Sequence, residues 1–294
     1  MKANQQRLYP NDHTPITTLP ITQGEKNQWF TSLTNEQHHS MKCISASSIK
    51  HWIKNSPWHW YQYYILKNRD PIKDNNDSFL MGTLIHMALL EPELYEKLVV
   101  VCDLDQRTKE YKEFIKTIPD GGYVIKSAQK AVIEGIRANV SKHKRAQFLI
   151  DQATPEQSGV AKCPVTGLWL SIRGDARGKD YFIDVKSCNN VSEEECIKAI
   201  INFGYGHQHA HYIETANLID GYGTYKNFYF LFVSKERPHE VALYHLDADA
   251  IAHFTKKRME VLRQIQKCQD SGKWPGADGE NHGKIITLPQ WGLK

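Results

Sequence analysis

The apolar and polar positions divide the chain into three parts with different periods. Residues 1–40 have few periodic apolar positions and are rich in Gln, Asn, Thr, His and Pro, which predicts a flexible or peripheral N-terminal arm. Ordered structure is expected from about Ile44, where apolar residues begin to recur at helical spacing. The predicted helices of this first part are two short ones on either side of Pro57, followed by 79–90, 109–118 and 127–149.

The helical period fades between Gln157 and Ser187. Turn signals at 164–167 and 178–180 separate apolar runs there, which predicts three antiparallel strands joined by short hairpins. The elements predicted for the last part are helices 192–203 and 207–218, strands 227–234 and 240–246, and a terminal helix 248–270.

This order of elements predicts one α/β domain with a mixed central β-sheet flanked by helices and an N-terminal helical elaboration. The domain is expected to cover residues 41–272, after the N-terminal arm and before a loose C-terminal tail over 273–294.

Composition is that of an ordinary globular protein, and we expect a cytoplasmic location. Hydrophobic residues make up 40% and charged residues 24% of the 294 residues. No window reaches the roughly 18 apolar residues of a membrane span, and the polar first residues lack the apolar core of a signal peptide. The six cysteines are scattered, so free thiols are expected. The net charge of +4 excludes a strongly polybasic protein and leaves a clustered nucleic-acid site open.

Three polar residues stand in or at the ends of the predicted central strands, where apolar residues are expected. Asp184 and Lys186 are two positions apart, so their side chains share one face of a strand. A predicted hairpin brings Asp175 beside Asp184. Adjacent carboxylates repel each other unless a cation lies between them, and oxygen ligands suit Mg²⁺ or Mn²⁺. A lysine there neutralises phosphate charge or orients the attacking water, so the triad indicates phosphodiester hydrolysis, although an isolated D-x-K is most often an ordinary strand end.

Further motifs favour the nuclease interpretation over an ordinary strand end. Gly174-Asp175, Asp184-Val185-Lys186 and the helical i, i+4 pair Gln208 and Tyr212 resemble the PD-(D/E)xK nuclease superfamily in its RecB-like branch. The upstream segment 82–86 resembles the Gly-x-x-x-His motif of the same branch. Two positions depart from the pattern, because Gly174 replaces the usual Pro and Asp184 the commoner Glu.

Within this branch, the chain from about Ser45 to Asp270 is similar to the RecE-type exonucleases (exodeoxyribonuclease VIII), relatives of phage lambda exonuclease. The similarity includes the run ending at Pro92 and a Glu156-x-Ser158 element. It implies a restriction-endonuclease-like core and a 5′-to-3′ exonuclease that digests one strand of linear double-stranded DNA, leaving 3′ overhangs for phage-type recombination. It also implies a RecT-like single-strand annealing protein as partner and a ring-like homo-oligomer, a trimer or tetramer.

The resemblance also implies roles for individual residues. Lys186 would assist the attacking water, Glu156 would be an acidic group near a second metal or the phosphate, and Gln208 with Tyr212 would support the site or contact the substrate. The implied metal ligands, for Mg²⁺ or Mn²⁺, are His86, Asp175, Asp184 and the Val185 carbonyl.

The residues expected to contact phosphate are less distinctive. Ser47 and Ser48 stand at a predicted helix start, where they could bind a 5′ phosphate or could be plain N-caps. Arg173 and Arg177 flank Asp175 and are candidates for phosphate contact.

Three histidines in one predicted helix raise the question of a zinc site. His207 and His211 share a helix face and His209 points away from both, so a surface or DNA-facing role is expected instead.

Two other hypotheses stay open. One is a RecB-type or CRISPR-associated nuclease that acts as an endonuclease or on single strands; the four-cysteine cluster of the CRISPR-associated relatives is absent from this sequence, where Cys268 stands alone near the C-terminus. The other is a DNA-binding or assembly module that retains the fold without catalysis.

Overall fold

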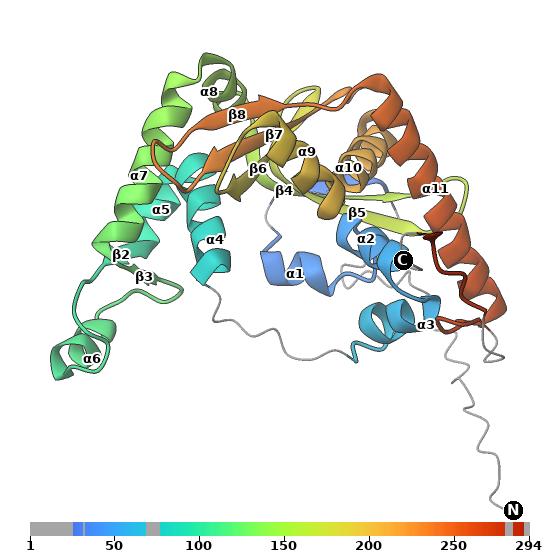
Figure 1. Ribbon diagram of the computed structural model, residues 1–294, viewed down its shortest axis with the longest axis horizontal. Coiled ribbons are helices and arrows are strands. Elements are labelled where there is room, and N and C mark those ends of the chain that lie inside the picture. Colours follow the sequence, from blue (N-terminus) through green and yellow to red (C-terminus); the bar gives the residue numbers. More distant parts are fainter. Residues whose placement is uncertain (1–25, 32, 69–76, 280–284, 291–294) are drawn as a thin grey trace, which may run out of the picture.

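The computed structural model describes residues 26–31, 33–68, 77–279 and 285–290. Six strands of this part form one mixed sheet in the order β1-β4-β5-β6-β7-β8 (Figure 1). Neighbouring strands are antiparallel except β6 and β7, which are parallel. The strands are β1 (Gln28–Phe30), β4 (Thr154–Lys162), β5 (Trp169–Arg177), β6 (Tyr181–Cys188), β7 (Asn227–Ser234) and β8 (Val241–Tyr244).

Helices cover both faces of the sheet, as Figure 1 shows. A separate parallel ladder pairs β2 (Val99–Val101) with β3 (Tyr123–Ile125). The described helices are α1 (Asn35–Ser40), α2 (Ala46–Lys54), α3 (Pro57–Trp60), the π-helix η1 (Tyr61–Ile65), α4 (Asp77–Leu90), α5 (Pro92–Leu98), α6 (Lys109–Ile115), α7 (Ser127–Lys142), α8 (Lys144–Asp151), α9 (Glu193–Asn202), α10 (Tyr205–Asp220) and α11 (Ala248–Ser271).

The central strands β6 and β7 are buried on both faces, and their side chains alternate between two cores. Ile183 and Val185 pack with apolar residues of β7 against α4, α5, α7 and α8. Phe182 packs on the other face, with the phenylalanines of β7 against α9 and α10. Because strand side chains alternate, Asp184 falls on the α10 face, where only 1% of its surface is exposed. A buried charge needs a partner, so this position requires compensation from neighbouring elements.

A third core joins the N-terminal helices to the terminal helix. Residues of α2, α3 and η1 pack there against α11. The long helix α11 is capped at its start by Asp247, whose side chain accepts a hydrogen bond from the Ala250 amide at 2.7 Å, and at its end by the left-handed Gly272. These caps define where the helix starts and stops.

The predicted mixed α/β sheet with flanking helices and the three predicted hairpin strands are confirmed. The expectation that ordered structure begins near Ile44 is wrong, because β1 pairs with β4 and α1 follows it. Trp29 of β1 packs over the space left by Gly159, where a Cβ atom would meet the indole at 2.6 Å. Residues 1–25 of the predicted arm lie outside the described residues.

Other boundaries also differ from the prediction. The helix expected over 127–149 is two helices, because His143 leaves the helical conformation and caps α8 by accepting a hydrogen bond from the Ala146 amide. Trp274, expected in a loose tail, is 7% exposed and belongs to the third core. The helix α5 and the β2–β3 ladder were not predicted.

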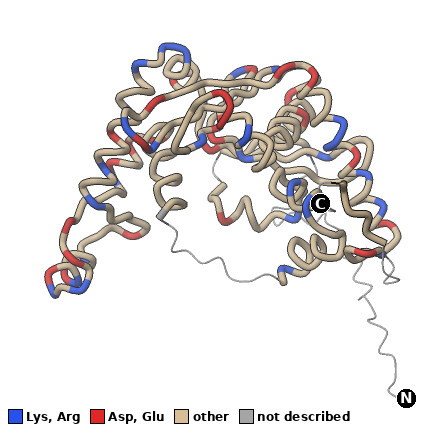
Figure 2. Tube along the Cα trace, in the orientation of Figure 1, with Lys and Arg blue, Asp and Glu red and all other residues tan. Residues whose placement is uncertain are grey.

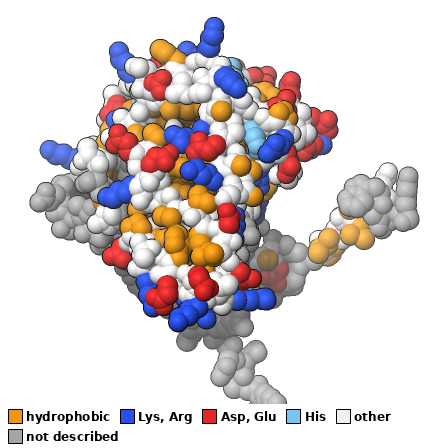
Figure 3. Space-filling view, turned by 90° about the vertical axis from the view of Figure 1, so that its left-hand side faces the viewer, with side chains coloured by type: hydrophobic (Ala, Val, Ile, Leu, Met, Phe, Trp, Pro, Cys, Tyr) orange, Lys and Arg blue, Asp and Glu red, His pale blue; other side chains and the backbone are white. Residues whose placement is uncertain are grey.

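Among the described helices, none combines the length and the apolar character needed to cross a bilayer. Charged residues of both signs are distributed over the elements in Figure 2. On the face shown in Figure 3, basic and acidic side chains stand next to each other among apolar ones. That face therefore presents no large area of one sign to attract a polyanion.

Three buried histidines make the fold sensitive to acid. Burial is the main reason that the pKa of His38 and of His209 is lowered to about 4, and burial together with the Arg258 guanidinium lowers the pKa of His211 to about 3. His211 Nε2 lies 3.1 Å from the Ser171 carbonyl oxygen, and Arg258 Nε donates to His211 Nδ1 at 3.4 Å. Protonation of His211 would break the contact with Arg258.

The unfolded chain, with histidine pKa values of about 6.5, takes up protons that the native state excludes. We expect stability to be full above pH 6.5 and to fall toward pH 4, by up to ~1.4 kcal/mol per pH unit for each such histidine. Urea unfolding at several pH values measures this slope. His209→Phe, which keeps a ring stacked on Phe228, should reduce it, and an unchanged slope would contradict this assignment.

Candidate active site

Asp184, Lys186 and Gln208 form a closed polar triangle between β6 and α10. Lys186 Nζ lies 2.5 Å from Asp184 Oδ2, and Gln208 Nε2 donates to Asp184 Oδ1 at 2.5 Å. Lys186 Nζ also donates to Gln208 Oε1 at 3.3 Å and lies 4.3 Å from the centre of the Tyr205 ring. The ammonium and the amide together compensate the buried carboxylate.

Strands β5 and β6 part where the two aspartates face each other. The strands are paired only at Ala176 with Ile183 and at Arg177 with Phe182. Beyond these pairs Asp175 turns its carboxylate toward the gap, where its Oδ2 accepts a hydrogen bond from the Val185 amide at 2.8 Å. The separation of the strands therefore creates room for ligands beside the carboxylates.

His86 reaches the same point from α4. Its Nδ1 lies 3.3 Å from Asp175 Oδ2, and 28% of its side chain is exposed. Leu84 and Ile85, both fully buried, hold this turn of α4 against the core that includes Val185. The imidazole is thus positioned by packing of its neighbours.

Burial and neighbouring charges both shift the pKa values of Asp175 and Lys186. Burial raises the pKa of Asp175 to about 6, the nearby Asp184 carboxylate adds to the rise, and His86 and Lys186 oppose it. Burial lowers the pKa of Lys186, but the carboxylates of Asp184 and Asp175 outweigh burial and raise it above the usual value. Lys186 is therefore a charged ammonium, and a further cation beside Asp175 would stabilise its ionised form.

The donors fit a small divalent cation in chemical type. Asp175 and Asp184 supply carboxylate oxygens, which suit Mg²⁺ or Mn²⁺, and His86 supplies a nitrogen. Asp184 Oδ2 is buried and has Lys186 as its close partner, and a carboxylate oxygen accepts two interactions. Within the part of the chain that the structure describes, no group of three or more His, Cys, Asp or Glu is gathered closely enough to hold a metal ion. The ligands would therefore have to turn toward an incoming cation.

The pair Gln208 and Tyr212 links α10 to both strands. Gln208 contacts β6 through Asp184 and Lys186, and Tyr212 donates its hydroxyl to the Arg173 carbonyl of β5 at 2.6 Å. Burial, followed by the charges of Asp184 and Asp175, raises the pKa of Tyr212 above its usual value. Its neutral hydroxyl thus serves as a hydrogen-bond donor that fixes β5 relative to α10.

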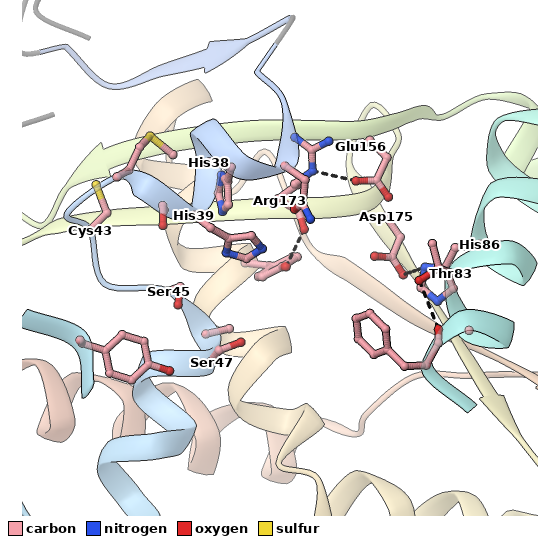
Figure 4. Close-up of a pocket in the computed structure, with 18 of the residues that line it drawn as sticks. His38, His39, Cys43, Ser45, Ser47, Thr83, His86, Glu156, Arg173 and Asp175 are labelled. Carbon is pink, nitrogen blue, oxygen red and sulfur yellow. Dashed lines mark hydrogen bonds and ion pairs between the residues drawn. The ribbon is translucent and has the colours of Figure 1, made fainter. Parts of the chain in front are cut away.

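A large cavity of about 1300 Å³ opens beside Asp175 and His86 (Figure 4). Arg173 and Glu156 lie in its lining, and Arg173 Nε donates to Glu156 Oε2 at 2.7 Å. Arg173 also donates to the Leu33 carbonyl at 2.9 Å, which ties the segment between β1 and α1 to the site. Glu156 has a left-handed φ of 52°, a strained conformation for a residue other than glycine.

The two predicted serines have different environments. Ser47 is exposed and lines the cavity. Ser48 is 1% exposed, and its hydroxyl accepts from the Ser45 amide at 3.1 Å and donates to the Ser45 carbonyl at 2.9 Å. Ser48 therefore acts as the capping partner of Ser45 at the start of α2, and Ser47 is the serine that a ligand can reach.

Arg177 lies apart from the cavity lining. Its guanidinium donates to Gln157 Oε1 at 2.5 Å and to the Tyr225 hydroxyl at 2.6 Å, and it stacks 4.1 Å from the centre of the Trp29 ring. Through these contacts Arg177 attaches β1 and the end of α10 to the sheet. Arg173 is the arginine that faces the cavity.

The expectation that the α10 histidines face the surface or DNA is wrong for two of them. His209 is 2% exposed and stacks on Phe228, and His211 is fully buried against Arg258. His207 is partly buried and contacts Phe254 of α11. The reason is that α10 lies between the sheet and α11, so most of its faces are covered.

Several residues of the site gave no signal in the sequence. Glu91, His38 and His39 line the cavity, and Lys50 lies close to Lys186. Burial and the neighbouring Lys186 ammonium lower the pKa of Lys50 to about 8. The two histidines stand in the segment assigned to a peripheral arm, so their place in the cavity could not be predicted.

Comparison with known proteins identifies the family. Residues 45–282 match the family model described as "PDDEXK-like domain of unknown function (DUF3799)". The match covers more than half of the chain, and the chain belongs to this PD-(D/E)xK-like family. No curated protein matches the chain.

Solved structures of similar fold include a candidate exonuclease from Eubacterium rectale. It has 13% sequence identity and a TM-score of 0.57, and the match covers 88% of this chain and 96% of that protein. An alkaline exonuclease from Laribacter hongkongensis matches with 16% identity over 62% of this chain and 95% of its own, and its TM-score of 0.26 is too low to show a common fold. At such identity the first match supports the fold alone.

The buried ion pair predicts a strong energetic coupling. Lys186→Met leaves the Asp184 carboxylate buried without its ammonium, and we expect a loss of ~3–5 kcal/mol in unfolding free energy. The double variant Asp184→Asn/Lys186→Met should recover much of this loss. Urea unfolding of the wild type, Asp184→Asn, Lys186→Met and the double variant at neutral pH gives the coupling energy between the two residues. Lys198→Met, which removes an exposed lysine paired with Glu194 and Glu195, is the control and should change stability little; additive effects at Asp184 and Lys186 would refute the coupling.

Proposed function

We propose that this protein is a divalent-metal-dependent exodeoxyribonuclease that acts on the ends of linear double-stranded DNA in the 5′-to-3′ direction. The observation that carries the proposal is the set Asp175, Asp184 and Lys186 at the parting of β5 and β6, with His86 beside Asp175. Two carboxylates, an ammonium and an imidazole around one opening match the needs of phosphodiester hydrolysis.

In this proposal, each residue of the set has a separate task. Asp175, Asp184, the Val185 carbonyl and His86 would hold Mg²⁺ or Mn²⁺, which would supply positive charge to the phosphate and lower the pKa of water. Lys186, which is paired with Asp184, would orient the attacking water or neutralise the phosphate with its ammonium. Gln208 keeps its hydrogen bond to Asp184, and Tyr212 keeps β5 in place.

The volume of the cavity favours a polymeric substrate over a small molecule. Its volume of about 1300 Å³ exceeds the ~300–1,000 Å³ typical of small-ligand sites. Ser47 and Arg173 lie in the same lining as Asp175 and offer a hydroxyl and a guanidinium for a phosphate. We propose that they hold the 5′-terminal phosphate while the neighbouring phosphodiester lies at the carboxylates, and that Glu156 sets the direction of Arg173.

The biological setting follows from the resemblance to RecE-type exonucleases. We propose that the 3′ overhangs serve phage-type homologous recombination, with a RecT-like single-strand annealing protein as partner. A ring-like homo-oligomer, a trimer or tetramer, would keep the enzyme on its DNA. These points rest on the motifs at 82–86, 174–175, 184–186 and 208–212.

Catalysis is expected to require Asp184. End-labelled linear duplex is incubated with Mg²⁺ and either the wild-type protein or Asp184→Asn, and degradation is followed on denaturing gels. We expect the variant to lose activity by two orders of magnitude or more, because a ligand to the cation is lost. Asp180→Asn, an exposed aspartate in the β5–β6 turn, should keep full activity. Equal degradation by wild type and Asp184→Asn would reject this active site, and no degradation by wild type would favour the non-catalytic module.

Polarity is tested on duplexes with blocked ends. We expect a block on the 5′ ends to stop degradation, a block on the 3′ ends to have little effect, and covalently closed circular DNA to stay intact. Ser47→Ala should reduce the preference for 5′-phosphorylated over 5′-hydroxyl ends, and Ser141→Ala, an exposed serine of α7, should leave it unchanged. Cleavage of circular DNA would favour the endonuclease hypothesis.

A further inference from the structure

A second part of the cavity lining is aromatic. Tyr63 and Tyr64, which we call the aromatic wall, line the same cavity as Asp175 and His86. Both residues belong to the π-helix η1, where the Leu66 amide donates to the carbonyl of Tyr61 five residues before it, at 3.1 Å. π-Helical turns are rare and are frequently found at functional sites. The aromatic wall comes from a different element than the carboxylates.

The end of α3 and the start of η1 are firmly anchored. Trp60 and Tyr61 are 1% and 3% exposed, and both rings stack on Trp274, with centres 5.6 Å and 4.7 Å away. Trp60 Nε1 also donates to the Ser48 carbonyl of α2 at 3.0 Å. The π-helix is therefore held between α2 and the segment after α11, and its cavity side is fixed with it.

The aromatic wall is also ordered by its own ring contacts. The centres of the Tyr63 and Tyr64 rings are 5.0 Å apart, and Tyr64 stacks on Trp60 at 5.5 Å. His51 of α2 packs against both tyrosines, at 4.7 Å and 5.3 Å. Because the rings are held in place before any ligand arrives, a ligand that stacks on them loses little of its binding energy to ordering the protein.

The lining carries lysines as well as aromatic rings. Lys42, which precedes α2, and Lys67, which follows η1, line the same cavity as the aromatic wall. The acidic groups of the lining, Glu91, Glu156 and Asp175, come from the end of α4 and from the sheet, where Glu156 is paired with Arg173. Cations interleaved with aromatic rings are the combination that binds single-stranded nucleic acid, with the cations along the backbone and the rings under the bases.

We propose that the aromatic wall stacks unpaired bases of the strand whose phosphodiester lies at Asp175 and Asp184. The inference rests on the proposed nuclease function and narrows its substrate. The strand reaches the carboxylates as single-stranded nucleotides, so a duplex end must open by a few base pairs before it is cut. Lys42 and Lys67 contact the phosphates between the stacked bases.

Binding is measured without cleavage, by fluorescence anisotropy in the Asp184→Asn background, with three probes. The first is a short oligothymidylate, the second is the same oligomer with abasic sites throughout, and the third is a blunt duplex whose end pairs are cross-linked. Tyr63→Ala and Tyr64→Ala should each weaken binding of the oligothymidylate by about five- to one-hundred-fold. Both variants should bind the abasic oligomer and the cross-linked duplex like the parent protein, because neither probe offers an unpaired base.

Control variants separate stacking from a structural effect. Tyr63→Phe and Tyr64→Phe keep the ring and should bind all probes like the parent. Tyr222→Ala, which removes an almost fully exposed tyrosine outside the cavity lining, should have no effect. If an alanine variant fails to fold, quenching of 2-aminopurine in the oligomer by the parent and the phenylalanine variants tests the same stacking.

The outcomes distinguish this inference from the proposed function. Alanine variants that weaken all three probes equally, or none, overturn the stacking, whatever the nuclease assay gives. If wild type degrades duplex DNA and the alanine variants bind oligothymidylate unchanged, the inference alone fails. If wild type degrades no DNA while stacking is observed, the exonuclease proposal fails and the single-strand binding surface stands.

Discussion

An ion pair buried between two hydrophobic cores is the interaction on which the rest of the site depends. Asp184 stands on a strand that is covered on both faces, and Lys186 follows it two positions later, so that one side of the same strand carries both charges. Removing either partner leaves a buried charge, which is far more costly than the pair itself. Gln208 of α10 completes the hydrogen bonding. The position of α10 over β6 is thereby tied to the chemistry of the site.

The second requirement for the site is that β5 and β6 separate after two residue pairs. Continued pairing would satisfy the backbone of Asp175 and leave no opening beside its carboxylate. The Val185 amide donates to the Asp175 side chain, so the departing strand keeps a hydrogen-bond partner. Tyr212 holds β5 at this point through the Arg173 carbonyl. The separation of β5 from β6, the position of the Asp175 carboxylate and the contact of α10 with β5 therefore depend on one another.

Features set by local spacing could be predicted from the sequence. The two-residue alternation placed Asp184 and Lys186 on one strand face, and the four-residue spacing placed Gln208 and Tyr212 on one face of α10. Features set by distant partners could not. Trp29 fits over Gly159, which lies about 130 positions later, and nothing near Trp29 indicates a strand. The buried state of His209 and His211 depends on α11 covering α10. The sequence left open whether Ser47 and Ser48 bind phosphate or cap a helix, and it could not show that Ser48 completes the capping box of Ser45 while Ser47 faces the cavity.

The stacking of Trp274 on Trp60 and Tyr61 joins residues more than two hundred positions apart. On the ribosome, the first helices emerge long before Trp274 does, so η1 lacks its support until the segment after α11 has been synthesised. A nascent chain therefore cannot complete the wall that carries Tyr63 and Tyr64, even after the strands with Asp175 and Asp184 have been synthesised. Assembly of this cavity wall therefore follows synthesis of the sheet and waits for the segment after α11.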